Sequence, residues 1–286
     1  MFSFVARIWL AVVLFGMASA TLPSYIKVCS RKDPDINNCI VNSVDQLRKK
    51  LATGLKELNV PAIEPLYLPH VYLTRGSGSR SNKFDVNITD LQVFHIPEFQ
   101  VIWFKADPEK LKFEFQLLFP KLDFQGKYKI NASFLLLKLI GEGNLNGTFN
   151  DYKASFILKG QKVVQNNITY AHFTKFKINI ISANKTRIFF DNLFNGNAVL
   201  GKFQYFALHE NVTKEILSIS IILVIFDCNN FIFTLGAASN DLLNNNSDLF
   251  LQELNPALET EVTKIFSDIA SKISSSFTYD ELFPDI

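Results

Sequence analysis

The chain of 286 residues predicts an α+β fold in which a strongly curved antiparallel sheet wraps a long helix. Three observations carry this prediction. An apolar stripe of helical period lies near the start, a middle region alternates apolar and polar residues, and a second long helical stripe lies near the C-terminus. Phenylalanine is also frequent, with 28 copies against 2 Trp. So many rings line either a large core or an apolar cavity.

The composition excludes several classes of protein. There are 29 Lys and Arg against 27 Asp and Glu, and this near balance argues against a dedicated nucleic-acid binder. Charged residues make up 20% and hydrophobic residues 48%, which is typical of a folded chain. Three Cys and four His are too few for a Cys-rich scaffold or a multi-ligand metal site. We therefore expect no nucleic acid, metal or cofactor to be bound.

The first twenty residues have the pattern of a secretory signal peptide. Arg7 gives a positive start, residues 8–15 are apolar, and small residues at 18–20 precede an expected cleavage after Ala20. The alternative is an uncleaved anchor, but the apolar run is too short to cross about 30 Å of hydrocarbon. We expect residues 1–20 to be removed and a single domain, 21–286, to be secreted into extracellular fluid without stable membrane insertion.

Cys29 and Cys39 lie close together after the signal peptide. In a secreted chain this spacing favours a disulfide, worth roughly 3 kcal/mol for so short a loop. The alternative is two buried free thiols, which the polar segment between them disfavours. Cys228 is expected to stay unpaired. Asp33 and Pro34 are typical of a helix N-cap and first helical residue, so the bridge is expected to fix a helix start.

A helix is predicted from Pro34 to near Asn59. Its apolar residues follow steps of three and four, giving about six turns. They are Ile36, Ile40, Val44, Leu47, Leu51, Leu55 and Leu58. Three prolines then predict an extended, irregular stretch over 61–69.

From Phe84 to about Leu193 the apolar residues recur at every second position, which predicts antiparallel strands with one apolar face. The predicted strands are 99–105, 113–119, 122–134, 152–159, 168–180 and 185–190. Turn signals between them lie at Asp107-Pro108, Gly141 to Gly147, Gly160-Gln161 and 182–184.

A second long helix is predicted near the C-terminus, with Asn255 as its cap and Pro256 in its first turn. Its apolar stripe comprises Leu254, Leu258, Val262, Ile265, Ile269, Ile273 and Phe277.

Asn-x-Ser/Thr sequons occur throughout the chain and make N-glycosylation a prediction for a secreted protein. Such triplets also arise by chance in an Asn-rich chain. The candidate sites are Asn87, Asn131, Asn146, Asn167, Asn184, Asn211 and Asn245.

No catalytic constellation is visible. The chain has no HExxH, GxSxG, P-loop or CxxC motif, and its four histidines show no shared ligand spacing. His172 is placed on a strand face near Tyr170 and Thr174, but no nucleophile pairs with it. The glycines at 141–147 lack a nucleotide-binding spacing and predict a hairpin turn. We expect no catalytic residue and no enzyme activity.

The alternating aromatic residues instead predict an apolar binding pocket. A lipophilic ligand gains roughly 25 cal/mol per Å² of apolar surface removed from water. The candidate contacts are Phe113, Phe115, Phe124, Tyr128 and Phe134. Two roles are open for Tyr128: its hydroxyl orients a ligand, or it is a core tyrosine bonded to the backbone.

Several longer segments carry a specific pattern. They are LPSYIKVCSRKDPDINNCIVNSVDQLRKKLATGLKELNVPAIEPLYLP at 22–69, the strand region 113–146, DNLFNGN at 191–197, ELNPALE at 253–259 and YDELFP at 279–284. These segments resemble the insect takeout / juvenile-hormone-binding-protein family across nearly the whole mature chain.

The resemblance implies a tubular-lipid-binding type of fold with an internal hydrophobic tunnel and a Cys29–Cys39 disulfide. It also implies secretion into haemolymph or a similar fluid and carriage of a small lipophilic ligand, either a hormone-type terpenoid or a fatty-acid-like lipid. Takeout-like members are associated with feeding and circadian output. The alternative is a secreted interaction protein that presents an apolar surface to a receptor or membrane. An esterase is disfavoured by the missing nucleophile.

Residues 202–236 depart from this pattern. They contain Cys228 and an apolar run at 216–226, which is shorter than a membrane span of about 20 residues. We interpret the segment as translated intron, because Gly201-Lys202 is codable as a splice donor, and 231–236 as a pyrimidine-rich tract ending in an acceptor. The competing interpretation is a genuine insertion that forms a loop or an added hairpin.

Overall fold

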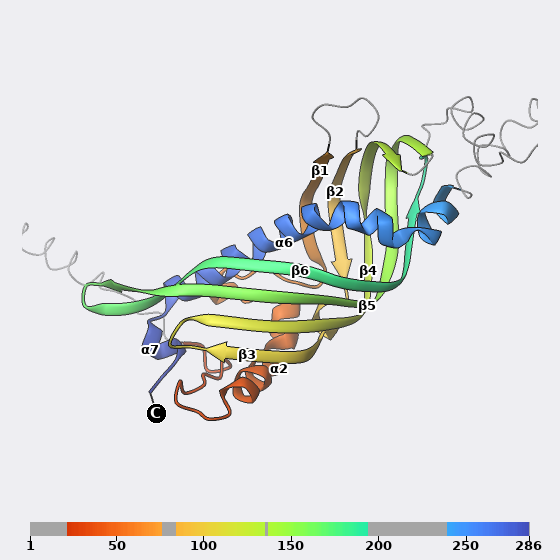
Figure 1. Ribbon diagram of the computed structural model, residues 1–286. Helices are drawn as coiled ribbons and strands as arrows, with labels where there is room; N and C mark the ends of the chain where they lie inside the picture. Colours follow the sequence, from red (N-terminus) through yellow and green to blue (C-terminus); the bar gives the residue numbers. More distant parts are fainter. Residues whose placement is uncertain (1–21, 76–83, 135–136, 194–238, 286) are drawn as a thin grey trace, which may run out of the picture.

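The computed structural model describes residues 22–75, 84–134, 137–193 and 239–285 (Figure 1). The predicted signal peptide, the segment 202–236, Asn211 and Cys228 lie outside these ranges. In chain order the elements are α2 (Ile36–Thr53), η1 (Lys56–Leu58), β1 (Leu66–Arg75), β2 (Phe84–Phe94), η2 (Ile96–Glu98), β3 (Gln100–Asp107), β4 (Lys112–Phe134), β5 (Leu137–Gln165), β6 (Ile168–Phe190), α6 (Ser247–Ser276) and α7 (Tyr279–Leu282).

The described strands form one antiparallel sheet in the order β1-β2-β4-β5-β6. Strand β3 pairs with the first half of β4, and β2 pairs with its second half. The sheet curls, and α6 runs along it against β6 and β1 (Figure 1). The predicted α+β class and curved sheet are confirmed, and the long helix that the sheet wraps is the C-terminal one.

The sheet changes direction at a corner shared by β4 and β5. On β4 the inward face passes from Phe119 to Leu122, and on β5 it passes from Phe149 to Tyr152. Asp151, in the left-handed region with φ 48°, lies at this change on β5. Both strands switch faces together, so their mutual register is unbroken while the sheet bends.

The glycine turn signals are wrong. Gly141 to Gly147 and Gly160 lie within β5, and 182–184 lie within β6. Gly141 faces the backbone of Asn192 and Leu193, and an added Cβ would lie 2.5 Å from the Asn192 carbonyl oxygen. The glycines therefore permit a close backbone crossing instead of a turn. The turn at Asp107-Pro108, between β3 and β4, is confirmed.

Both predicted helix starts need correction. Helix α2 begins at Ile36, and Asp33 accepts a hydrogen bond from the Asp35 amide at 2.8 Å in the preceding turn. Helix α6 begins at Ser247, so Pro256 lies inside it. A proline removes the hydrogen bond to the residue four positions earlier, here Gln252, and both residues are exposed to solvent.

Two further boundaries differ from the prediction. Helix α2 ends at Thr53, and the remaining apolar residues form a 3-10 turn in which Leu55 and Leu58 pack around Phe277. The stretch 61–69, predicted to be extended and irregular, contains the first residues of β1, which runs from Leu66 to Arg75. Pro69 is tolerated there because β1 is an edge strand, which pairs only with β2 among the described strands.

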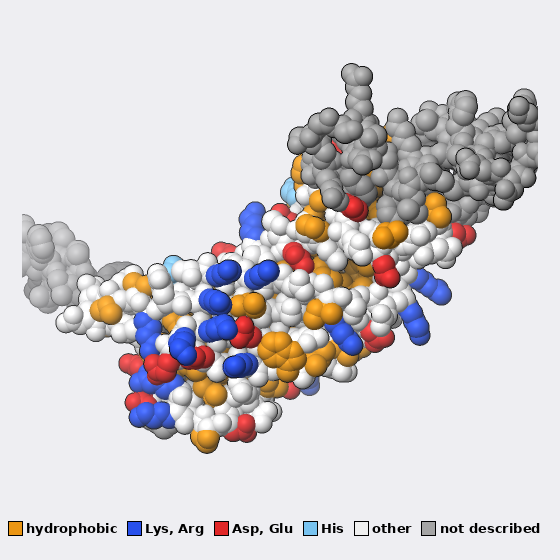
Figure 2. Space-filling model, viewed as in Figure 1, with side chains coloured by type: hydrophobic (Ala, Val, Ile, Leu, Met, Phe, Trp, Pro, Cys, Tyr) orange, Lys and Arg blue, Asp and Glu red, His pale blue; other side chains and the backbone are white. Residues whose placement is uncertain are grey.

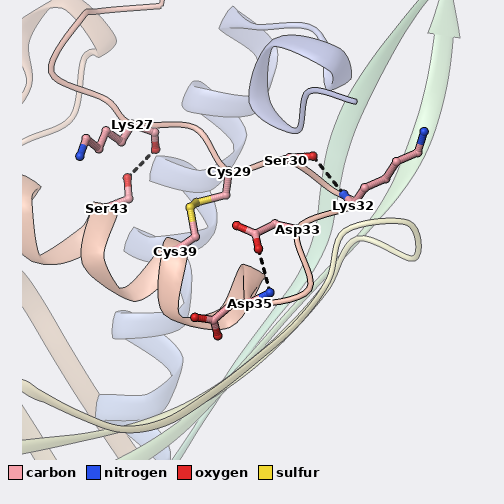
Figure 3. Close-up of a disulfide and its surroundings, with 8 residues drawn as sticks. All are labelled: Lys27, Cys29, Ser30, Lys32, Asp33, Asp35, Cys39 and Ser43. Carbon is pink, nitrogen blue, oxygen red and sulfur yellow. Dashed lines mark hydrogen bonds between the residues drawn. A yellow bond between two sulfur atoms is a disulfide. The ribbon is translucent and has the colours of Figure 1, made fainter. Parts of the chain in front are cut away.

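The predicted disulfide is present between Cys29 and Cys39 (Figure 3). It joins the N-terminal segment to the first turn of α2. One turn further along, the Ser43 hydroxyl donates to the Lys27 carbonyl oxygen at 2.5 Å. The N-terminal segment is thus attached to α2 at two places.

The visible outer face carries lysine, arginine and acidic side chains together with scattered hydrophobic ones (Figure 2). Lys112, Lys159 and Lys175 lie directly opposite one another on β4, β5 and β6. Most apolar residues of these strands lie on the opposite, inward face, whereas Val164 of β5 and Ile181 and Phe189 of β6 are exposed.

Candidate functional site

An apolar cavity of about 570 Å³ lies inside the curled sheet. Its wall comes from α2, the inward faces of β1 to β6, α6, and the residues after α7. This volume is typical of sites for small ligands. The helical stripes and the strand alternation therefore line one common apolar cavity.

A belt of stacked aromatic rings crosses the wall from β3 to α6. Phe104 stacks on Phe115 at 5.7 Å between ring centroids, and Phe115 stacks on Phe156 at 4.9 Å. Phe176 continues the belt from β6, 6.0 Å from Phe156, and stacks on Phe266 of α6 at 5.5 Å. The belt forms because cross-strand register places the first three rings side by side.

The C-terminal segment contributes Leu282 and Phe283 to the cavity wall. Phe283 stacks on Phe113 at 5.7 Å, and both line the wall. Arg31 holds this segment in place: its guanidinium donates to Asp280 at 2.6 Å and to the Phe283 carbonyl at 3.1 Å, and it lies 5.3 Å from the centroid of the Tyr279 ring.

The predicted ligand contacts have different positions. Phe113, Phe115 and Phe124 line the cavity. Tyr128 is not among the lining residues: it packs in the adjoining core, and its hydroxyl donates to the Asp191 carbonyl. This geometry matches the backbone-bonded role considered for Tyr128, not the ligand-orienting one. The side chain of Phe134 lies outside the described residues.

Sequence reasoning missed several wall residues. Phe156 and Phe176 stand on strands that the alternation had already predicted, so the same signal was sufficient to find them. Phe266 lies off the predicted apolar stripe of its helix. Tyr152 stands at the start of the predicted strand 152–159 and in phase with Phe156, so the same alternation was sufficient to find it as well.

Polar side chains are few in the described wall: Lys27, Ser43 and Tyr152. The Ser43 hydroxyl is already bonded to the Lys27 carbonyl. Burial, followed by the nearby Glu259 carboxylate, raises the pKa of Tyr152, so its hydroxyl is neutral at physiological pH.

The described residues hold no group of three or more His, Cys, Asp or Glu placed to bind a metal. No helix in the described ranges is long and apolar enough to cross a membrane. His172 is exposed on β6. Of the candidate sequons in the described ranges, Asn87 is partly buried. The exposed ones are Asn131, Asn146, Asn167, Asn184 and Asn245.

The described residues thus form a curled antiparallel sheet with an apolar cavity between its inward face and a long helix. The family model described as haemolymph juvenile hormone binding protein (JHBP) matches residues 8–220 and 211–284. The chain belongs to this family. The two matched segments overlap at 211–220, which lies within the predicted insert.

Known relatives agree with this assignment. The chain is 25% identical over 192 residues to the circadian clock-controlled protein daywake of Drosophila melanogaster, covering 64% of this chain and 71% of that protein. It is 24% identical over 189 residues to daywake of Drosophila yakuba, with the same coverage. The crystal structure of Epiphyas postvittana Takeout 1 aligns over 90% of this chain and 99% of its own, with a TM-score of 0.65 at 14% identity. This last likeness shows the fold.

Proposed function

We propose that the protein is a secreted, non-enzymatic carrier of a small lipophilic ligand, either a juvenile-hormone-like terpenoid or a fatty-acid-like lipid. The apolar cavity carries this proposal, because it can remove much of an apolar molecule's surface from water while offering few polar groups. Membership in a family of binding proteins supports it.

The proposed setting is an extracellular fluid such as haemolymph, after removal of residues 1–20. The Cys29–Cys39 disulfide and the exposed sequons support an oxidising, extracellular environment. The proposed physiological role is in circadian output or feeding, and the similarity to proteins named circadian clock-controlled supports the first of these.

The carrier proposal is tested on protein purified from the medium of secreting cells. Native mass spectrometry followed by organic extraction is expected to reveal a bound lipid, and an apolar fluorescent probe is expected to bind at micromolar concentration. Absence of both from folded protein would overturn the proposal.

A matched pair of variants locates the site. Val262 lines the cavity from α6, so Val262→Trp is expected to fill part of it and weaken probe binding at least tenfold. Val164 is 66% exposed near the end of β5, so Val164→Trp adds the same group outside the cavity and is expected to leave binding unchanged. Equal effects of the two changes would contradict a site inside the cavity.

One observation favours the alternative of a secreted protein that presents an apolar surface to a membrane or receptor. Val164 and Ile168 are exposed at the hairpin of β5 and β6, which extends beyond the rest of the sheet (Figure 1). Stable flotation with liposomes by a protein whose cavity is empty would support this alternative, and Val164→Asp would then abolish flotation.

A further inference from the structure

Lysine side chains gather on the outer face of the sheet over β3 to β6 (Figure 2). Inward residues of these strands line the cavity, and the residues between them point outward. The register places Lys112, Lys159 and Lys175 directly opposite one another across three strands. The whole cluster, here named the lysine face, comprises Lys105, Lys112, Lys153, Lys159, Lys175 and Lys177.

Glu114 is a carboxylate within the lysine face. It accepts a hydrogen bond from Lys112 at 2.7 Å and lies opposite Lys105 in the ladder. The hydrogen bond from Lys112, opposed by burial and helped by the charges of Lys112, Lys105 and Lys159, lowers the pKa of Glu114. One carboxylate is thus shared by three lysines and does not neutralise them all.

The acidic groups at the nearby turn between β3 and β4 are already paired. Asp107 lies opposite Lys112 in the ladder, but its carboxylate accepts from Lys110 at 2.9 Å. Glu109 accepts from Lys162 at 2.7 Å. These carboxylates therefore do little to offset the charge of the lysine face.

Lys153, Lys159, Lys175 and Lys177 form no ion pair with the residues that the structure describes. Strands lie about 4.8 Å apart, so opposed lysines lie within the Debye length of about 8 Å at physiological salt. Like charges directly opposite one another destabilise a sheet. The chain as a whole is nearly balanced, at +2, so a generally basic composition does not explain this cluster. An anionic partner would relieve the repulsion.

The arrangement of the lysines restricts the chemistry of that partner. The row from Lys112 to Lys175 crosses three strands and spans roughly 10 Å, which suits a linear polymer with repeated charges. Lysine is a point charge, whereas arginine binds one phosphate or carboxylate with a two-pronged contact. Anionic lipids are concentrated in the cytoplasmic leaflet, which a secreted protein does not meet. These features favour an extracellular polyanion.

We propose that the lysine face binds a linear sulfated polysaccharide at cell surfaces or in the extracellular matrix. Such binding would hold the protein near a cell while the cavity, on the opposite side of the sheet, stays free. The inference goes beyond the carrier function: it rests on the proposed secretion but not on what the cavity contains. It also differs from contact through the exposed apolar residues of the β5–β6 hairpin, because it depends on charge.

The test measures the affinity of the purified full chain for heparin, a linear sulfated polysaccharide, over a series of salt concentrations. Binding is expected to weaken steeply with salt, because each lysine contact releases a counterion from the polymer. Lys159→Gln combined with Lys175→Gln is expected to lower the slope of log affinity against log salt by about two, one for each lysine. Neutral dextran is expected not to bind.

Lys49→Gln combined with Lys56→Gln is the matched control. It removes the same charge from exposed positions on α2 and η1, outside the lysine face, and is expected to leave the salt slope unchanged. Urea unfolding is expected to show both double variants folded, with the lysine-face variant at least as stable as the wild type, since like charges are removed. Equal losses of slope would show that net charge alone drives binding and would overturn the inference.

The remaining outcomes separate this inference from the others. Absence of heparin binding would overturn it and leave the carrier function standing, because probe binding in the cavity is measured separately. Heparin binding that persists at high salt would assign the contact to apolar groups and overturn it as well. Flotation with vesicles containing phosphatidylserine, without heparin binding, would assign the lysine face to an anionic membrane instead.

Discussion

Gly141 lets the segment after β6 lie directly against β5. The Asn192 side-chain amide donates to the Glu142 carbonyl at 2.9 Å, and the Tyr128 hydroxyl donates to the Asp191 carbonyl. A methyl group at position 141 would lie 2.5–2.7 Å from backbone atoms of Asn192 and Leu193, so the backbone would have to shift.

Gly141→Ala is therefore expected to lower the free energy of unfolding by about 1–3 kcal/mol, the usual range for overpacking. Gly126→Ala is the control, because its added Cβ would lie 3.1 Å from the nearest atoms instead of 2.5 Å. Urea unfolding of both variants measures the difference. Equal losses would show that the close crossing at Gly141 is not the cause.

His95 connects β2 to two neighbouring elements. Its Nδ1 lies 2.8 Å from Glu98 of η2 and its Nε2 lies 3.2 Å from Asp123 of β4. The hydrogen bond to Glu98, opposed by some burial and helped by the charges of Glu98 and Asp123, raises the pKa of His95. The folded state therefore binds this proton more tightly than the unfolded state does.

The resulting stabilisation is complete below the unfolded pKa of about 6.5 and is lost as pH rises through the higher folded pKa. We expect His95→Asn, which also tolerates the left-handed backbone at this position, to be more destabilising at pH 5.5 than at pH 9. The effect is small, because His95 is 36% exposed. Unfolding curves at the two pH values, with exposed His172→Asn as control, measure it; a pH-independent loss would contradict this role.

The candidate ligand contacts show how far alternation predicts a site. It places Phe113, Phe115 and Phe124 on one apolar face, and all three line the cavity. It also places Tyr128 on that face, but a face can border either a cavity or a packed core. The choice depends on the segment after β6, whose approach no local pattern predicts.

At the scale of elements, α2 is attached to the N-terminal segment by the Cys29–Cys39 bridge and the Ser43–Lys27 hydrogen bond. This attachment positions Ile26, Val28 and the apolar face of α2 in the cavity wall. Replacing both cysteines with serine is expected to lower the free energy of unfolding by about 3 kcal/mol, since the unfolded chain regains the freedom of the closed loop.

Cys228→Ser is the matched control, because this cysteine is predicted to be unpaired. It is expected to leave stability unchanged, and non-reducing peptide mapping should recover Cys29 linked to Cys39. A link from Cys228 to either residue would contradict the prediction.

Helix boundaries were the least predictable elements. The Asn255-Pro256 pair is typical of a helix start, yet α6 already runs from Ser247. Burial of Phe250 and Leu254 against the core outweighs one missing backbone hydrogen bond at Pro256. The cap signal is local, whereas this burial depends on the finished sheet.

At the scale of the whole molecule, the sequence predicts the fold class but not the length of the strands. Strand β5 has 29 residues because the chain stays extended at its glycines, where the sequence predicted turns. The bend that curls the sheet around α6 does have a signal in the sequence. The inward-facing apolar residues of β4 step from Phe119 to Leu122, so the apolar and polar positions exchange there. Strand order follows from pairings between distant segments, which alternation does not specify.

The C-terminal end of β6 is hydrogen-bonded to the helical segment 239–245. The Phe190 amide donates to the Asn240 side chain, which donates in return to the Phe190 carbonyl, both at 2.9 Å. Asn244 makes the same pair of contacts with Ile188, at 2.7 and 2.9 Å. The chain thus leaves and re-enters the described fold at neighbouring points, so a short connection is sufficient to span them.

This geometry makes the intron interpretation of 202–236 testable on the protein. A variant lacking these residues retains 194–201 and 237–238 as the connection, and about ten residues span up to roughly 33 Å. It is expected to fold with an unchanged or higher free energy of unfolding, to bind the apolar probe as the full chain does, and to aggregate less, since an apolar run is removed. Transcript sequencing is expected to show a dominant message that joins Gly201 to Ala237. Peptides from 202–236 in the secreted protein, or a deletion variant that fails to fold, would instead establish the segment as a genuine part of the molecule.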